Sequence, residues 1–189
     1  MFKLTTTLLF TSLLLISCGG SSDDEPFTEG SLVSKWSFED YDYIGGFSSG
    51  GSRVTFENVP FGVLVITTEE DENNGAFSGS SLTITYPLRG PGNYNVVSLG
   101  ETGEFLSEQS TEKALTISCT VGSAFVNATR YEALNGGQVL VSVDSNGNYR
   151  FNTSSPILIG KALDLEGGVP DRPDSGNLTI EDAYNFTGN

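Results

Sequence analysis

Residues 80–88 read Ser-Ser-Leu-Thr-Ile-Thr-Tyr-Pro-Leu, and an apolar side chain occupies every second position from Leu82 to Leu88. Successive side chains of a β-strand point to opposite faces, so the apolar side chains line one face and the hydroxyl side chains the other. The same alternation recurs in three later segments, which are Leu115–Val121, Val139–Val143 and Tyr149–Thr153. This period of two predicts strands with one face in a core and the other face outside it.

Turn-forming residues separate these segments. Asp144-Ser145-Asn146-Gly147-Asn148 lies between two alternating segments and contains Asn-Gly, the strongest short hairpin signal. About ten short strands at this spacing predict an all-β fold, namely a single antiparallel β-sandwich, with a β-barrel as the alternative. Phe61–Ile66 is a continuous apolar run, which is typical of a strand covered on both faces. Only Glu104–Ala114 could be helical by composition.

The composition excludes several function classes. The chain has 189 residues, which suits one domain with a substantial core, and its net charge at pH 7 is −15. Such a charge repels polyphosphate, so nucleic acid is excluded as a partner. The sequence contains no histidine, which removes Ser-His-Asp and Cys-His triads and histidine-ligated zinc or haem. We expect no cofactor and no bound metal.

The N-terminal segment is typical of a secretory signal. Lys3 precedes an uncharged stretch, Leu4–Ile16, that is rich in leucine. As a helix this stretch would cover about 20 Å, which is short of the roughly 30 Å hydrocarbon core of a bilayer. We therefore interpret it as a signal peptide and not as a transmembrane helix.

The end of this stretch, Leu15-Ile16-Ser17-Cys18, resembles the lipobox of bacterial lipoproteins. The resemblance implies cleavage before Cys18, which would become the acylated N-terminus and carry chains such as palmitate. At about 0.8 kcal/mol for each buried methylene, several acyl chains would anchor the protein stably in a membrane. Gly19–Pro26 follows as a flexible acidic tether. Within it, Ser22-Asp23-Asp24-Glu25 resembles the export signal of Bacteroidota surface lipoproteins, which implies an outer-membrane protein exposed at the cell surface.

Three later motifs resemble uncharacterised β-sandwich lipoproteins of Bacteroidota, namely Ser80–Tyr86, Gly92–Tyr94 and Ser175–Ile180. This resemblance implies a fold and a location, and it implies no activity. The expected organisation is a signal peptide at 1–17, the lipidated cysteine with its tether at 18–30, and a single β domain at 31–189.

Trp36, Tyr41 and Tyr43 are the candidate ligand-binding residues. In residues 36–43, aromatic rings that can stack on sugars adjoin carboxylates that accept hydrogen bonds from hydroxyl groups. The pattern suits a glycan-binding surface. The alternative is that Trp36 and Phe38, which share one face of a strand, belong to the core and that the residues after them form a loop.

Three other stretches invite a chemical interpretation, and each has a plainer one. Cys119 lies on the apolar face of its strand, so we expect a small buried side chain and not a nucleophile. Glu69-Glu70-Asp71-Glu72 and Asp144–Asn148 offer oxygens to calcium, but adjacent carboxylates diverge, and solvated hairpin tips are favoured. Asp174-Ser175-Gly176 matches a string found in aspartic proteases, yet its polar, proline-containing surroundings favour a loop that leads into a strand.

These observations favour a non-catalytic protein. We expect a lipid-anchored envelope protein that acts as a structural or protein-interaction module, through an exposed sheet face or an edge strand. Its partners would be the membrane, reached through Cys18, and another envelope protein. A glycan- or ligand-binding module is the first alternative, and an exposed Trp36 would favour it. The second alternative is a hydrolase with an acidic pair, but no pair can be selected among the 24 acidic residues.

Overall fold

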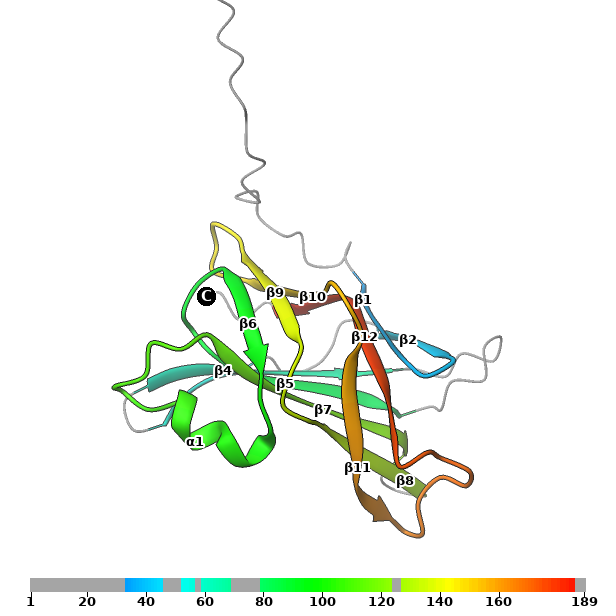
Figure 1. Cartoon of the computed structure of the whole chain (residues 1–189). Coiled ribbons are helices and arrows are strands. Elements are labelled where there is room, and N and C mark those ends of the chain that lie inside the picture. Colours follow the sequence, from blue (N-terminus) through cyan, green and yellow to red (C-terminus); the bar gives the residue numbers. More distant parts are fainter. Residues whose placement is uncertain (1–32, 46–51, 57–58, 69–78, 124–126, 186–189) are drawn as a thin grey trace, which may run out of the picture.

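A computed structural model describes residues 33–45, 52–56, 59–68, 79–123 and 127–185 (Figure 1). The predicted signal peptide, Cys18, the predicted acidic tether and Glu69–Glu72 lie outside these residues. Twelve strands dominate the described part, so the prediction of an all-β fold is confirmed. The strands are β1 (Ser34–Phe38), β2 (Tyr41–Gly45), β3 (Ser52–Phe56), β4 (Val59–Thr67), β5 (Ser81–Pro87), β6 (Gly92–Val96), β7 (Ala114–Ser123), β8 (Asn127–Ala133), β9 (Gln138–Val143), β10 (Tyr149–Thr153), β11 (Ile157–Leu165) and β12 (Ser175–Asn185).

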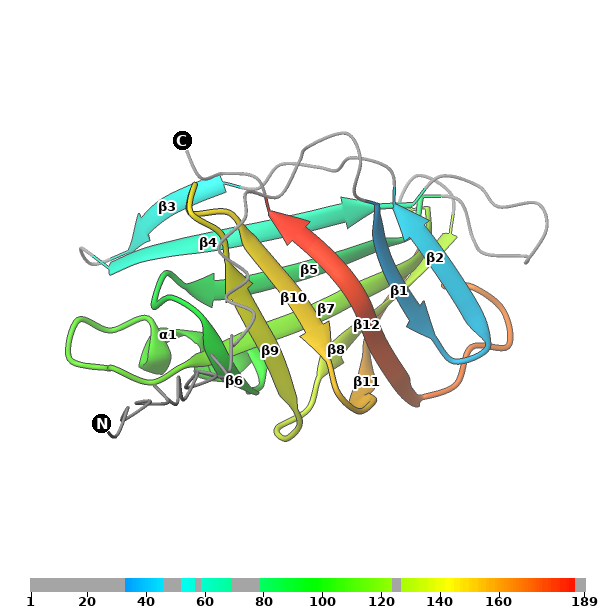
Figure 2. The same ribbon diagram turned by 90° about the horizontal axis from the view of Figure 1, so that it is seen from above.

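The strands form one hydrogen-bonded sheet that folds over into two layers. The neighbours follow the order β2-β1-β12-β10-β9-β6-β7-β5-β4-β3. Figure 2 shows β1, β2, β9, β10 and β12 in one layer, crossing over β3, β4, β5 and β7 in the other. Because β11 joins β12 to β8, and β8 pairs with β7, the pairing closes into a circuit. The branches β1–β2 and β5–β4–β3 leave this circuit, so the fold is not a regular barrel.

One pair of neighbours departs from the antiparallel prediction. β6 and β7 run parallel through the pairs Asn95↔Ala114 and Val96↔Leu115, whereas the other pairs of described strands are antiparallel. A parallel pair requires a long connection that returns the chain to the end from which it started. Residues 97–113 supply this connection, and they contain the short helical turns η1 (Leu99–Glu101) and α1 (Thr102–Phe105).

The main core lies between the two layers and consists of the side chains that the alternation predicts to face inward. Leu82, Ile84 and Tyr86 of β5 are fully buried, whereas the hydroxyl residues between them are half-buried on the opposite face. The ring of Tyr86 lies 5.0 Å from that of Tyr149 and 4.7 Å from that of Phe151, measured between centroids. The Asn185 side-chain amide donates a 2.6 Å hydrogen bond to the Tyr86 hydroxyl, which connects β5 to β12 across the core.

A second, smaller apolar cluster lies on the outer face of the β4–β5–β7 layer. Phe105 and Leu106 pack there against Ala114, and Phe61 and Val97 adjoin them. This cluster covers only one end of the outer face. α1 ends at Phe105, so most of the stretch whose composition permitted a helix is not helical.

The continuous apolar run in β4 is covered on one face only along most of its length. Leu64 and Ile66 are buried in the main core, whereas Val63 and Val65 are half-buried on the outer face. The expectation that both faces of this strand are covered is therefore wrong beyond Phe61. Within the described ranges, no helix combines the length and the apolar character needed to cross a membrane.

Candidate functional site

Two of the three candidate aromatic residues lie in the core. Trp36 and Tyr43 are directly opposite each other in the β1–β2 hairpin, and their rings stack at 4.0 Å with an interplanar angle of 12°. Their side chains are 1% and 0% exposed, so neither ring offers a face to a sugar in this conformation. Tyr41 is half-buried, and the Arg172 guanidinium lies 5.2 Å from the centre of its ring. Ligand binding by these three residues stays a prediction.

Cys119 lies in the core, as predicted from its place on the apolar face of β7. Its side chain is 1% exposed, and burial raises the pKa of its thiol far above the ordinary value of 9.0. A buried, protonated thiol is a poor nucleophile because the thiolate is the reactive form. Cys119 therefore serves as a small apolar residue.

The predicted hairpin between β9 and β10 is confirmed, and Asp144 holds its turn together. One Asp144 carboxylate oxygen accepts hydrogen bonds from the backbone N–H of Asn146, at 2.9 Å, and of Asn148, at 2.8 Å. The other oxygen accepts a 2.9 Å hydrogen bond from the Asn148 side-chain amide. Ser145 and Asn146 are exposed at the tip, as expected, whereas Asp144 is only 6% exposed and its carboxylate organises the turn.

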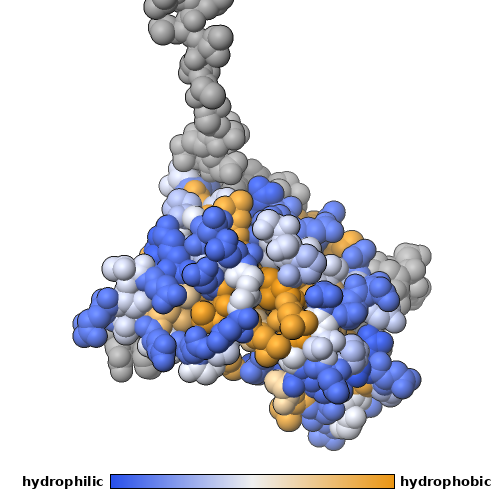
Figure 3. All heavy atoms as spheres, in the orientation of Figure 1, coloured by the Kyte–Doolittle hydropathy of each residue, from blue (hydrophilic) through white to orange (hydrophobic). Residues whose placement is uncertain are grey.

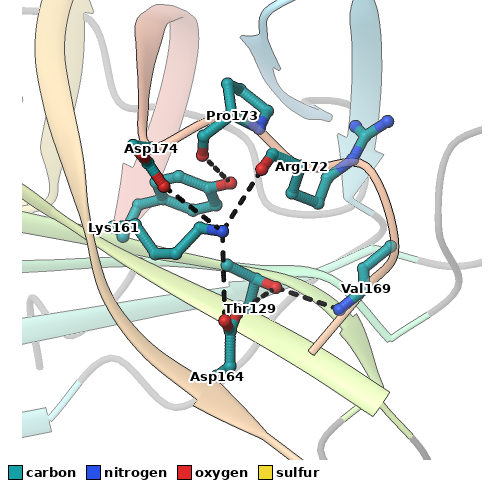
Figure 4. A network of polar contacts seen from close by, with 8 residues as sticks. Thr129, Lys161, Asp164, Val169, Arg172, Pro173 and Asp174 are labelled. Atoms are coloured by element: carbon teal, nitrogen blue, oxygen red, sulfur yellow. Dashed lines mark hydrogen bonds and ion pairs between the residues drawn. The ribbon is translucent and has the colours of Figure 1, made fainter. Parts of the chain in front are cut away.

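Asp174 lies in the loop that leads into β12, as expected, and belongs to a polar network that fastens this loop (Figure 4). The Lys161 ammonium donates a 3.2 Å hydrogen bond to the Arg172 carbonyl. The same ammonium lies 3.7 Å from the carboxylate of Asp174 and 3.9 Å from that of Asp164. The Lys161 backbone N–H also donates a 2.7 Å hydrogen bond to the Asp174 carbonyl. Lys161 therefore joins the C-terminal end of the loop to β11.

Two residues of β8, Thr129 and Tyr131, extend the network, and Figure 4 labels Thr129 below the loop. The Thr129 hydroxyl donates to the Asp164 carboxylate at 2.8 Å and accepts from the Val169 backbone N–H at 3.0 Å. The Tyr131 hydroxyl donates a 2.8 Å hydrogen bond to the Pro173 carbonyl, and burial raises its pKa to about 12. All of these groups hold the loop on β8, so the network is structural. Sequence reasoning did not find it, since its members meet only where β8, β11 and the loop before β12 come together.

A hollow of about 480 Å³ lies beside α1, and its wall consists of Val59, Pro60, Arg89, Ser107, Glu108 and Ser110. Its cation, Arg89, is already engaged. One terminal nitrogen donates to the Ser110 hydroxyl at 3.2 Å and to the Glu112 carbonyl. The other donates to the carbonyls of Phe105, at 2.9 Å, and Ser107, at 3.4 Å. These contacts use the hydrogens of both terminal nitrogens, so Arg89 clamps the loop and is a poor anion receptor.

The outer face of the β4–β5–β7 layer has a different character. Beyond the α1 cluster, its described side chains carry no charge, and seven of them are half-buried. We call these residues the neutral face, and they are Val63, Val65, Ser81, Thr83, Thr85, Ser118 and Thr120. The register places hydroxyl residues side by side on neighbouring strands, as in Ser81↔Thr120 and Thr83↔Ser118. The valines of β4 flank this array, since Val63 pairs with Thr85 and Val65 with Thr83.

The outer face continues across β8 and β11 and ends in exposed leucines. Ser118 pairs with Glu132, whose carboxylate forms a 3.2 Å ion pair with Arg130. Beyond this ion pair, the Leu134 N–H donates a 3.2 Å hydrogen bond to the Leu158 carbonyl. The side chains of Leu134 and Leu158 are 46% and 51% exposed. Figure 3 shows apolar side chains exposed in the middle of the side seen in Figure 1, with hydrophilic ones around them.

The part of the chain that the structure describes contains no group of three or more acidic, cysteine or histidine residues arranged to hold a metal ion. Comparisons of the chain with protein-family models, with curated proteins and with solved structures found no match. The candidate site that remains is therefore a surface, the neutral face with its leucine border. The alternation of serine and threonine in β5 and β7 already marks this face in the sequence.

Proposed function

We propose that this protein is a non-catalytic envelope protein, anchored in the outer membrane through a lipid on Cys18, which binds another protein through the neutral face. The anchor rests on the lipobox Leu15-Ile16-Ser17-Cys18 and on the acidic tether that follows it. Exposure at the cell surface rests on the likeness of Ser22–Glu25 to a surface-export signal.

The observation that carries the binding proposal is the absence of charge on the described outer face of β4, β5 and β7, in a chain of net charge −15. The centre of a protein interface is depleted of charged residues, because a charge that loses its water without a partner is costly. A flat array of valines and hydroxyl groups can be covered without that cost. Leu134 and Leu158 would add apolar area at its border.

The burial of Trp36 and Tyr43 favours a protein partner over a glycan, because sugar recognition uses exposed aromatic faces. The net charge of −15 disfavours self-association and favours a partner with neutral or basic surroundings. The neutral face carries no charged side chain, so it would not repel a partner of this kind.

Photo-crosslinking in the cells that make the protein tests this proposal. A photo-reactive phenylalanine analogue replaces Thr83 or Ser118 on the neutral face, and Ser145 at an exposed hairpin tip serves as the matched control. We expect a defined adduct from positions 83 and 118 and none from position 145. A charge on the same face should abolish the adduct. This is tested by adding Thr83→Asp to the variant that carries the photo-reactive residue in place of Ser118. Equal crosslinking from all three positions would contradict the proposal.

The anchor is tested separately by metabolic labelling with a palmitate analogue. The natural chain should incorporate the label and fractionate with the outer membrane, and Cys18→Ser should do neither. Labelling that survives this substitution would remove Cys18 as the anchor. Digestion of intact cells by an added protease then reports whether the domain faces outward.

A further inference from the structure

Two turns of the described part contain the same dipeptide, Asn-Gly. Asn146-Gly147 lies between β9 and β10, and Asn135-Gly136 lies between β8 and β9, whereas Asn74-Gly75 falls outside the described residues. Both described asparagines are exposed, and both of the glycines that follow them have a positive φ, of 79° and 116°. The two copies therefore agree in sequence and in exposure of the asparagine, which makes their different contacts informative.

The side-chain amide of Asn135 is held at both ends. Its oxygen accepts a 2.7 Å hydrogen bond from the Ser98 backbone N–H, and its nitrogen donates a 2.6 Å hydrogen bond to the Glu101 carboxylate. Glu101 is itself held by a 3.1 Å hydrogen bond from the Ser98 hydroxyl. Rotation of the Asn135 amide would break two hydrogen bonds, one of them strengthened by a charge.

The side-chain amide of Asn146 has no such restraint. The Asn146 backbone N–H donates to the Asp144 carboxylate, but the side-chain amide has no hydrogen-bond partner among the described residues. The glycine nitrogens are restrained alike, since the Gly147 N–H donates to the Asp144 carbonyl at 3.0 Å, and the Gly136 N–H donates to a carbonyl of β6 at 3.1 Å. The two copies therefore differ in the freedom of the asparagine amide.

This freedom matters because an asparagine followed by glycine can lose its side-chain nitrogen. The backbone nitrogen of the glycine gives up its proton and bonds to the side-chain amide carbon Cγ. The Cγ–Nδ2 bond breaks, ammonia leaves with the proton, and a five-membered succinimide ring remains. Water then opens the ring at either carbonyl and gives aspartate or isoaspartate. Glycine favours the attack because it has no side chain to shield its nitrogen.

We infer that Asn146 is a site of spontaneous deamidation, with water as the other reactant, and that the contacts with Ser98 and Glu101 protect the identical dipeptide at Asn135. The Asn146 amide can turn its carbon toward the Gly147 nitrogen without breaking a side-chain hydrogen bond. The Asn135 amide must first leave both of its partners.

The modification changes the β9–β10 turn. Both products carry a negative charge in place of a neutral amide, and isoaspartate also adds a methylene to the backbone between residues 146 and 147. This methylene shifts the Gly147 N–H from the Asp144 carbonyl and the Asn148 N–H from the Asp144 carboxylate. Deamidation therefore loosens the turn that Asp144 organises.

The first test follows both copies while the purified full-length protein ages, folded, in mildly alkaline buffer. Mass spectrometry of proteolytic fragments assigns the mass gain to position 135 or 146, and methylation by an isoaspartyl methyltransferase identifies isoaspartate. We expect position 146 to react at least several-fold faster than position 135 in the folded protein, and the two to react at similar rates in guanidinium. Equal rates in the folded protein, a faster reaction at position 135, or no reaction at position 146 would overturn the inference.

The second test removes the protection of Asn135. Glu101→Ala takes away the acceptor of its amide nitrogen and should speed deamidation at position 135 without changing the rate at position 146. Glu101→Gln retains an acceptor oxygen and should have a smaller effect. An unchanged rate at position 135 in Glu101→Ala would contradict the proposed protection.

Asn146→Gln is the control for the assignment of the reactive site. Glutamine has one more methylene in its side chain, so attack by Gly147 would require a larger ring, and the mass gain at position 146 should disappear. A mass gain that persists in the same fragment would assign the reaction to another residue.

Discussion

The Thr153 hydroxyl serves as both a donor and an acceptor for the backbone of Ile180. It accepts a 2.9 Å hydrogen bond from the Ile180 N–H and donates a 3.2 Å hydrogen bond to the Ile180 carbonyl. β11 pairs with residues 175–178 of β12, and β10 pairs with residues 183–185, so Ile180 lies in the gap between two strands on one edge. Thr153 fills this gap and lets the sheet pass from one layer to the other without unpaired backbone groups.

Thr153→Val keeps the shape of the side chain but removes the hydroxyl. It should destabilise the protein by about 1–3 kcal/mol, because backbone groups of Ile180 are left without their hydrogen-bond partner. Thr153→Ser retains the hydroxyl and should retain most of the stability. Urea unfolding followed by circular dichroism measures both variants. An unchanged midpoint for Thr153→Val would show that the hydroxyl is not needed at this gap.

Gly62→Ala should also destabilise the fold, by about 1–3 kcal/mol, because of overpacking. A Cβ atom at position 62 would overlap the phenol ring of Tyr86, which packs directly on the backbone of Gly62 in the neighbouring strand. Gly103→Ala is the matched control, since nothing lies within 4 Å of a Cβ at that position. The two variants are compared by thermal unfolding, and equal shifts in Tm would refute the steric argument.

Arg89→Lys should loosen the loop between α1 and β7 while leaving the sheet intact. Lysine preserves the charge but cannot bind the hydroxyl and the carbonyls that the two terminal nitrogens of Arg89 reach together. We expect faster cleavage within residues 106–112 during limited proteolysis, with little change in the global unfolding midpoint. Arg130→Gln, which breaks a half-buried surface ion pair worth about 0–1 kcal/mol, should leave the cleavage rate unchanged.

Stability should decline as the pH rises above about 9. Burial raises the thiol pKa of Cys119 in the folded state, so the folded protein retains a proton that the unfolded chain releases above the ordinary pKa of 9.0. The contribution of this proton to stability is therefore full below that pH and is lost above it, by up to about 1.4 kcal/mol for each pH unit. Tyr43 and Tyr94, whose pKa values burial also raises, should add to the decline above the ordinary value of 10.0.

Cys119→Ala tests the assignment of this alkaline loss. It should remove most of the loss between about pH 9 and pH 10 and make the decline above pH 10 shallower, where the remaining loss belongs to tyrosine. Urea titrations at successive pH values measure the effect, in a Cys18→Ser background so that one thiol titrates. An identical slope in the two proteins over that interval would assign the loss to other groups.

Trp36 should emit with a blue-shifted maximum and resist quenching by acrylamide. It is the single tryptophan of the sequence, and it lies 1% exposed under the stacked ring of Tyr43. Steady-state fluorescence measures the emission maximum and the quenching of Trp36 in the folded protein. The protein unfolded in guanidinium gives the values for a fully exposed ring. Red-shifted, readily quenched emission from the folded protein would place the ring at the surface and revive the glycan alternative.

The division of each strand into an inner and an outer face could be predicted from the sequence. The alternation in Ser81–Pro87 assigns Leu82 and Ile84 to the core and Thr83 to the outside, as observed. The same local logic predicts the turn at Asp144–Asn148. These features follow from successive residues alone, because the direction of a side chain in a strand depends only on its position along that strand.

The partners of the strands could not be predicted in this way. Nothing local to Asn95 or Ala114 specifies that β6 and β7 pair in parallel. Likewise, Lys161 meets Asp174 only because the β11–β12 loop closes, and Tyr43 approaches Ser80 only because the layers stack. Backbone hydrogen bonds are the same for every residue type, so the choice between possible neighbours depends on how the whole set of apolar faces is buried together.

The sequence by itself therefore determined an all-β fold, the inward side chains of its strands and a chain with a large negative charge. The tertiary structure alone decided that the uncharged faces of β4, β5 and β7 adjoin one another, that Trp36 lies under Tyr43, and that Arg89 and Lys161 fasten loops. The physical reason is that alternation is a property of one strand, whereas a surface or a cross-link requires the register between strands that are distant in the sequence.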